Sequence, residues 1–253
     1  MLLVAVAGFF TGVLSGMFGV GGAVISTPAI LLLGATPLQA VGSTLPSIIP
    51  SSVSGTLRYA RDGLVEGRAV LFTGLAGAAS AALGAVGSEL VPGRGHVQMV
   101  LTAALMGFTA YRTATLKAAP SSAGRGPLNL GAGRLIAIGL MAGLLSGFLG
   151  VGGGILMVPA FTAFVGFELK RAIATSLACV GIIAIPGTIT HQLLGNVDWF
   201  YALPLMVTSI PGARVGAHFA INASERSLRI TVASILGIIA VAYGTVEIVQ
   251  LSR

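Results

Sequence analysis

Long stretches without a charged residue constrain this chain more than any other feature of its sequence. No charged residue precedes Arg58, and none lies between Arg134 and Glu168. Further uncharged runs fill 69–88, 172–197 and 230–246. Each run can supply the roughly 20 apolar residues of a membrane-spanning helix, and none alternates as a β-barrel strand does. The sequence therefore predicts an all-α, polytopic membrane protein.

The composition supports a membrane environment and argues against a nucleic-acid-binding role. Of the 253 residues, 55% are hydrophobic and only 8% are charged, whereas about a quarter are charged in a typical soluble domain. The net charge of +7 comes from cations in short segments between apolar runs, which is the pattern of topology signals. We expect lipid bilayer surroundings, a location in the cell inner (plasma) membrane and no nucleic-acid partner.

The start of the chain and its cysteine content narrow the class further. The first residues, MLLVAVAGFF, lack the positive region of a signal peptide and are interpreted as part of the mature protein. The single cysteine, Cys179, excludes an internal disulfide framework and a Cys-rich metal site. We expect neither a cofactor nor a bound metal.

An internal repeat organises the chain. Residues 12–28 read GVLSGMFGVGGAVISTP, and residues 143–159 read GLLSGFLGVGGGILMVP. A Gly-, Pro- and Ser-rich segment, KAAPSSAGRGPLNLGAG, separates the two copies and is typical of a linker. The sequence predicts a first membrane repeat over 1–116, a cytoplasmic linker over 117–133 and a second membrane repeat over 134–253.

The first apolar segment of each copy is too long for one straight span. The predicted segments are 2–33, 38–57, 69–90 and 96–116, followed by 135–165, 171–190, 198–220 and 228–250. A single helix over 2–33 would be roughly 48 Å long against about 30 Å of hydrocarbon. Clustered glycines interrupt its middle, and each costs about 1 kcal/mol inside a helix. We predict two half-helices joined by an unwound, Gly-rich turn in each copy.

The distribution of Lys and Arg predicts how these broken segments lie. If each returns to its own side of the membrane, three full spans remain per copy, and eleven of the 14 cations lie on one side. A single crossing by the broken segment gives a much poorer separation. The first arrangement makes the copies inverted repeats, each with a re-entrant first helix and three spanning helices. It places both termini outside the cytoplasm.

At its repeated motifs the sequence resembles the sulfite exporter TauE/SafE family. The motifs are SGMFGVGG at 15–22, SGFLGVGGG at 146–154, AVGSTL at 40–45, AIATSL at 172–177 and GARVG at 212–216. This resemblance covers nearly the whole chain and implies transport of small sulfur anions such as sulfite, sulfonates or sulfoacetate, usually outward. The two copies differ where Ala23 aligns with Gly154 and Ala82 aligns with Arg214.

The broken helices and nearby hydroxyls supply the candidate binding site. Backbone N–H groups freed at a helix break, at the positive end of a helix dipole, favour an anion, and glycine permits close approach. For the GxxxG portions, 12–16 and 143–147, helix packing is the favoured interpretation. The predicted solute-binding residues are Gly19, Gly21, Gly22, Ser43, Thr44, Gly150, Gly152, Gly153, Gly154, Thr175, Ser176 and Arg214.

Two groups in that set have a competing structural interpretation. The Ser and Thr hydroxyls can donate to an anion, or they can bond to a carbonyl of their own helix. Arg214 lies inside an apolar segment, where its guanidinium can hold an oxyanion in a bidentate manner. It can equally extend towards the membrane interface.

The sequence predicts a non-enzymatic secondary transporter that exports small sulfur oxyanions. A passive anion channel and a permease for another small organic anion stay open as alternatives. A serine hydrolase using Ser146 and His191 is disfavoured because Tyr59 replaces the histidine in the first copy and no carboxylate is buried to orient a base. A cation or metal permease is disfavoured by the scarcity of intramembrane carboxylates. The oligomeric state and the role of His191 and His218, as proton carriers or interfacial residues, stay open.

Overall fold

The computed structural model describes residues 1–91, 96–115, 131–150 and 152–251, and these form a bundle of helices without strands. The first half contains α1 (Leu2–Phe18), α2 (Ala23–Leu32), α3 (Pro37–Ala60), α4 (Gly67–Leu90) and α5 (His96–Thr115). The second half contains α6 (Ala132–Leu149), α7 (Gly154–Ala160), the π-helical segment η1 (Phe161–Val165), α8 (Leu169–Leu193), α9 (Trp199–Asn222) and α10 (Glu225–Leu251). The all-α prediction is confirmed.

Both predicted interruptions are present. A turn separates α1 from α2, and another separates α6 from α7, at the two glycine clusters. Most of the predicted linker, 117–130, lies outside the described residues, and its last two residues already belong to α6. Elsewhere the helix ends lie within a few residues of the predicted segments.

Several described helices suit a bilayer. Gly67–Leu90, Ala132–Leu149 and Leu169–Leu193 are long and apolar enough to span a membrane, and Leu2–Phe18, Ala23–Leu32 and Gly154–Val165 are shorter apolar helices. Large apolar side chains such as Leu75, Leu83 and Leu193 are exposed on the outside of the bundle. The interior instead contains many small and hydroxyl-bearing residues, as expected when lipid, rather than water, surrounds the protein.

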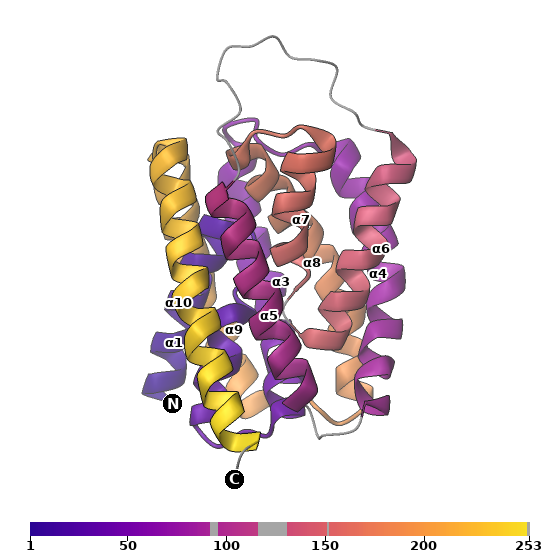
Figure 1. Ribbon diagram of the computed structural model, residues 1–253, viewed down its shortest axis with the longest axis vertical. Helices are drawn as coiled ribbons and strands as arrows, with labels where there is room; N and C mark the ends of the chain where they lie inside the picture. Colours follow the sequence, from indigo (N-terminus) through magenta and orange to yellow (C-terminus); the bar gives the residue numbers. More distant parts are fainter. Residues whose placement is uncertain (92–95, 116–130, 151, 252–253) are drawn as a thin grey trace.

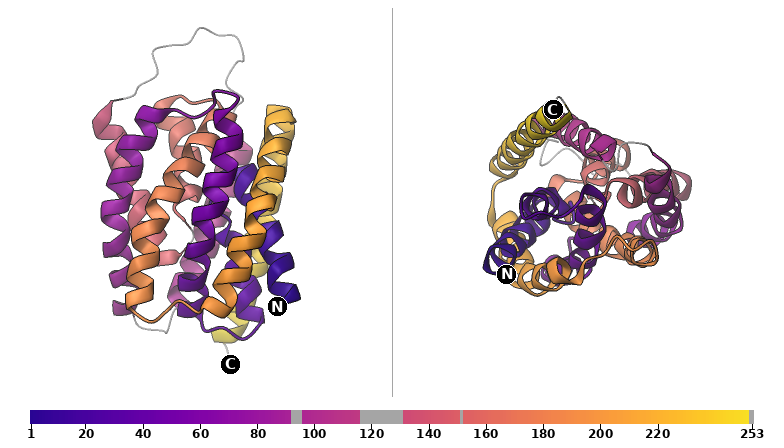
Figure 2. Two further views of the ribbon diagram at one scale, coloured as in Figure 1. Left: turned by 180° about the vertical axis from the view of Figure 1, so that it is seen from behind. Right: turned by 90° about the horizontal axis from the view of Figure 1, so that it is seen from below.

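Corresponding helices of the two halves run in opposite directions. In Figure 1, α1 begins at the lower end of the bundle, beside the N-terminus, whereas α6 begins at the upper end. Likewise, α5 rises through the bundle and α10 descends, and the reverse view in Figure 2 agrees. This arrangement is compatible with inverted repeats. Their orientation across a membrane stays a prediction.

The two halves interlock through matching pairs of helices. Helix α1 packs on α9, as α6 packs on α4, and the pairs α3–α8 and α5–α10 join the halves. In the first two pairs glycine brings the backbones together. A Cβ atom at Gly12 would overlap the backbone of Ser209, and one at Gly143 would overlap the backbone of Gly77. The packing interpretation of the GxxxG portions is confirmed.

This packing predicts that Gly143→Ala destabilises the protein. The added methyl group would meet the carbonyl of Gly77 and force α6 away from α4, so we expect a loss of about 1–3 kcal/mol. The matched control is Gly107→Ala, whose methyl group would lie 3.9 Å from Ala240 Cβ, an ordinary contact. Because Ala is the better helix former by about 1 kcal/mol, the control should be neutral or stabilising. Thermal unfolding in detergent measures both, and equal midpoints would contradict the prediction.

Candidate functional site

Positive backbone φ angles explain why adjacent glycines form the two turns. In the first turn φ is 68° at Gly19, 87° at Gly21 and 81° at Gly22. In the second turn the corresponding glycines Gly150, Gly152 and Gly153 have φ of 68°, 81° and 66°. Residues with a Cβ atom adopt this left-handed region only at an energetic cost. Each break therefore depends on several glycines together.

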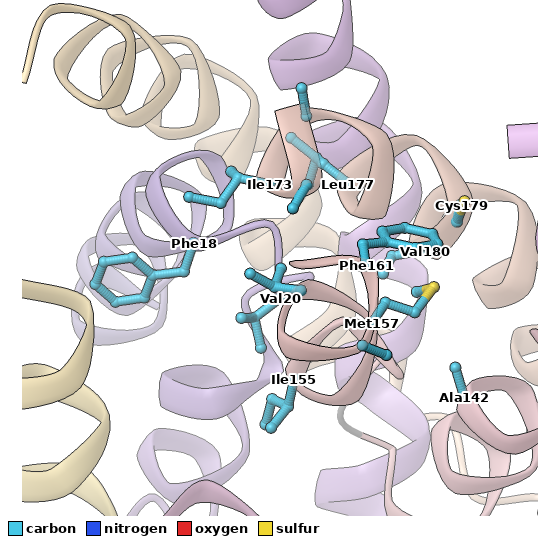
Figure 3. Packing of buried hydrophobic residues seen from close by; sticks show 14 of the residues in the cluster. Phe18, Val20, Ala142, Ile155, Met157, Phe161, Ile173, Leu177, Cys179 and Val180 are labelled. Carbon is cyan, nitrogen blue, oxygen red and sulfur yellow. The ribbon is translucent and has the colours of Figure 1, made fainter. Parts of the chain in front are cut away.

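The two turns meet inside the bundle. Gly154 packs so closely that a Cβ atom there would overlap the carbonyl of Gly19 and lie 2.7 Å from Val20 Cα. Ile48 and Val180, at equivalent positions of α3 and α8, both pack against Gly21 and Gly152. Figure 3 shows Val20 beside α7, which carries Ile155 and Met157. The two breaks thus form one buried region shared by both halves.

A hydroxyl group from the opposite half lies near the carbonyl end of each broken helix. Ser176 Oγ donates to the carbonyl of Gly19 at 2.8 Å. At the equivalent position, Thr44 Oγ1 lies 3.0 Å from the carbonyl of Val41 in its own helix and 3.5 Å from that of Gly150. The terminal carbonyls of α1 and α6 therefore have polar neighbours across the junction, as a helix end in an apolar interior requires.

The preceding hydroxyls fasten the loops of the opposite half. Ser43 Oγ accepts a hydrogen bond of 2.8 Å from the amide of Asp198, immediately before α9. Thr175 Oγ1 accepts one of 3.2 Å from the amide of Glu66, immediately before α4. The structure brings all four predicted hydroxyls to the junction of the halves. Their contact with a solute stays a prediction.

A buried aromatic side chain binds each broken helix one turn before its end. Tyr59 Oη donates to the carbonyl of Gly16 at 2.6 Å, and His191 Nε2 lies 2.9 Å from the carbonyl of Gly147. Because a carbonyl only accepts, Nε2 carries the proton. Tyr59 and His191 occupy equivalent positions of the two halves, and both are fully buried.

The amide ends of the second half-helices have no such partners. Among the described residues, none accepts a hydrogen bond from the amides of Gly21, Gly22 or Ala23 at the start of α2. The same holds for Gly153 and Ile155 at the start of α7. These residues are buried. Donors of this kind, at the positive end of a helix, favour an anion.

Three hydroxyls that the sequence did not place in the site adjoin this region. Thr11, Ser15 and Ser146 are at most 1% exposed, and their hydroxyl oxygens have no hydrogen-bond partner in the described part of the chain. The side chains of Thr11 and Ser15 lie directly against Gly22. Ser15 and Ser146 stand at equivalent positions one turn before the glycine that ends each half-helix, a spacing that could have identified them.

Arg214 lies apart from this group. It is exposed on α9, whereas its neighbours Gly212 and Gly216 face α1. The structure therefore does not bring Arg214 together with the buried glycine turns. Cys179 is buried in α8, and His218 is exposed on α9, where Asn222 lies within hydrogen-bonding distance.

An apolar hollow of about 510 Å³ lies elsewhere on the surface. It is lined by Met1, Trp199, Phe200, Leu203, Pro204, Val207 and Thr208. Its walls offer almost no hydrogen-bond donors, so it suits a lipid chain better than an anion.

The bond across the junction predicts that Ser176→Ala weakens the fold. Removing the hydroxyl leaves the buried carbonyl of Gly19 without this donor, and we expect a loss of about 1–3 kcal/mol. The control is Ser51→Ala, because Ser51 is equally buried but bonds to Ile48 within its own helix. Thermal unfolding in detergent should show the larger decrease for Ser176→Ala. A larger decrease for the control would contradict the assigned role.

Comparisons with known proteins agree with a transporter. The family model described as sulfite exporter TauE/SafE matches residues 4–243. The probable membrane transporter protein YunE of Bacillus subtilis (strain 168) is 26% identical, covering 96% of this chain and 95% of that protein. YjnA of the same organism, also a probable membrane transporter protein, is 26% identical, with 90% and 94% covered. A probable membrane transporter protein of Xylella fastidiosa (strain 9a5c) is 28% identical, with 85% and 82% covered. No solved structure matches the chain.

Proposed function

Because this chain belongs to the sulfite exporter TauE/SafE family of membrane transporters, we propose that it is a secondary transporter for small sulfur oxyanions such as sulfite or organosulfonates. In this proposal the anion binds between the two broken helices, near the middle of the cell inner membrane, and leaves the cytoplasm. The relatives support membrane transport in general. The substrate and the direction are our proposal.

The observation that carries the proposal is the meeting of two helix N-termini with unpartnered buried donors. The amides of Gly22 and Ala23 open α2, and that of Gly153 adjoins the start of α7. Backbone amides can only donate, so they favour an oxyanion over a cation or an apolar solute. The unpartnered hydroxyls of Ser15 and Ser146 add donors without adding charge.

The neutral character of this region suits release as well as binding. The buried polar side chains of the described residues are Ser and Thr hydroxyls, the Tyr59 hydroxyl, Gln98 and His191. A buried Lys or Arg would hold an anion through an ion pair, whereas amide and hydroxyl dipoles hold it less tightly. The compact, three-oxygen end of a sulfite or sulfonate can accept several such donors at once.

The interlocked halves offer a route for alternating access. Each half contributes one broken helix, and the hydroxyls of Thr44 and Ser176 reach across to the opposite one. Small rotations of one half against the other would expose the turns to one side and then the other. Flux should therefore saturate with solute concentration.

Ser146→Ala should weaken anion binding without weakening the fold. The Ser146 hydroxyl has no hydrogen-bond partner among the described residues, so its removal costs no hydrogen bond to them. Losing one donor to a charged ligand should raise Kd about tenfold to a hundredfold. The measurement is the shift of the unfolding temperature with increasing sulfite or sulfoacetate, and Ser15→Ala should behave similarly.

Two controls make this result specific. Ser88→Ala removes a buried hydroxyl that bonds to Ala85 in its own helix, and it should leave the ligand response unchanged. Arg214→Ala tests the sequence-based expectation that this guanidinium holds the anion. A ligand response that survives Ser15→Ala and Ser146→Ala but disappears with Arg214→Ala would move the site to the exposed face of α9.

A solute screen tests the proposed substrate class. Purified protein should be stabilised by sulfite, thiosulfate or sulfoacetate more than by simple carboxylates, because the sulfur oxyanions present more acceptor oxygens to converging donors. In proteoliposomes, labelled solute should enter with saturable kinetics. Flux that rises linearly with concentration would indicate a passive channel, and stabilisation by carboxylates alone would indicate a permease for another organic anion.

A further inference from the structure

The equivalent residues Tyr59 and His191 make the same bond but differ in proton chemistry. Each binds a carbonyl one turn before the break of a half-helix, Gly16 in α1 and Gly147 in α6. A tyrosine hydroxyl stays protonated near neutral pH, whereas an imidazole can take up a second proton there. The two halves are therefore alike in structure, but only the second has at this position an imidazole, which can gain a proton on mild acidification.

The second ring nitrogen of His191 leads to the surface through Asn196. Asn196 Nδ2 lies 3.4 Å from His191 Nδ1 and 2.6 Å from Glu89 Oε1. Because the Glu89 carboxylate accepts, the NH₂ group of Asn196 faces it, and the same NH₂ group donates to Nδ1. The ring is therefore in its neutral form, with Nδ1 as an acceptor. Glu89 is exposed at the end of α4.

Among the described residues, few other charges act on this ring. Glu89, from α4, interacts electrostatically with His191. Asp198, in the loop before α9, accepts from the amide of Phe200 and caps that helix. The other helical elements packed on α8 include α1, α3, α6, α7, η1 and α10, and they bring no charged side chain of the described residues to the ring.

We propose that His191 is the binding site for a proton that is coupled to anion transport, and that Asn196 and Glu89 connect it to the outside of the membrane. This inference rests on the proposed function. Glu89 is the last residue but one of α4, and α4 ends at the same end of the bundle as both termini (Figure 1). In the predicted orientation this end lies outside the cytoplasm. A proton entering there and passing inward would drive an anion outward.

Protonation of His191 must rearrange Asn196. A proton from water binds Nδ1 and converts it from an acceptor into a donor, so it can no longer accept from the Asn196 NH₂ group. The amide group rotates to present Oδ1 to Nδ1–H, which breaks the bond from Asn196 Nδ2 to Glu89. The Glu89 carboxylate then lies near an imidazolium and offsets its charge. Loss of the proton from Nδ1 to water restores the first arrangement.

The rearranged loop reaches the junction of the two halves. The amide of Asn196 donates to the carbonyl of His191 at 2.9 Å, and its own carbonyl packs against Gly42 of α3. Two residues later, the backbone amide of Asp198 donates to Ser43 Oγ. A change at Asn196 is thus passed to α3 beside Thr44, and through His191 to the last turn of α6.

The first experiment needs no solute. Trp199 is the sole tryptophan of the chain and opens α9 directly after this loop, so its fluorescence reports movement there. The wild-type protein should show a fluorescence transition as the pH falls below about 6.5, the ordinary pKa of an imidazole. His191→Tyr, which reproduces the residue of the first half, should lack the transition, and His218→Gln should retain it. No transition in the wild type, or an unchanged one in His191→Tyr, would overturn the proposal.

The second experiment separates coupling from transport. Proteoliposomes containing the full chain are exposed to labelled sulfoacetate, whose carboxylate stays ionised above about pH 5. Without a pH gradient, the rate of solute exchange by His191→Tyr should stay within about twofold of the wild-type rate. With a pH gradient, His191→Tyr should accumulate at least about tenfold less solute than the wild type. If the His191→Tyr variant does not fold, His191→Gln is tested in its place, because the glutamine amide can also donate to the carbonyl of Gly147. If gradient-driven accumulation survives both substitutions, the coupling role is refuted. If the wild type shows the fluorescence transition but no sulfoacetate exchange, only the proposed solute is refuted.

Discussion

A helix that ends inside an apolar environment leaves backbone carbonyl and amide groups without partners, and both halves of this protein contain such an end at their centre. Exposing these groups to lipid would cost several kcal/mol each. The structure resolves the two kinds of group differently. The final carbonyls of α1 and α6 have the hydroxyls of Ser176 and Thr44 as neighbours, whereas the first amides of α2 have no acceptor among the described residues.

This asymmetry connects the architecture with transport. The carbonyl of Gly19 accepts from Ser176 of the second half, so the break in the first half depends on the second half. Amide groups that lack a partner make the same place suitable for an anion. The interlocked packing of α1 on α9 and of α6 on α4, made close by glycine, holds these breaks in the bundle interior. Any relative movement of the halves must therefore act on the turns.

The two halves are not equivalent in chemistry. Tyr59 and His191 make corresponding bonds, yet only His191 has a second nitrogen with a path to an exposed carboxylate. A duplicated scaffold can keep its geometry while one copy acquires a different proton chemistry. In this protein the difference lies one helical turn from the proposed anion site, where coupling requires it.

The sequence by itself determined the membrane class, the helix order and the two breaks, because long uncharged runs and clustered glycines act locally. It also identified the glycines of both turns, since only they adopt positive φ cheaply. It could not decide which group each hydroxyl binds, because Ser176 and its acceptor Gly19 lie 157 residues apart. Tertiary structure placed Arg214 on the exposed face of α9 and left the hydroxyls of Ser15 and Ser146 buried, with no hydrogen-bond partner in the part of the chain that the structure describes. Helix rotation and packing between the repeats decide which side chains are exposed and which groups they bind. Neither leaves a clear pattern in one apolar sequence.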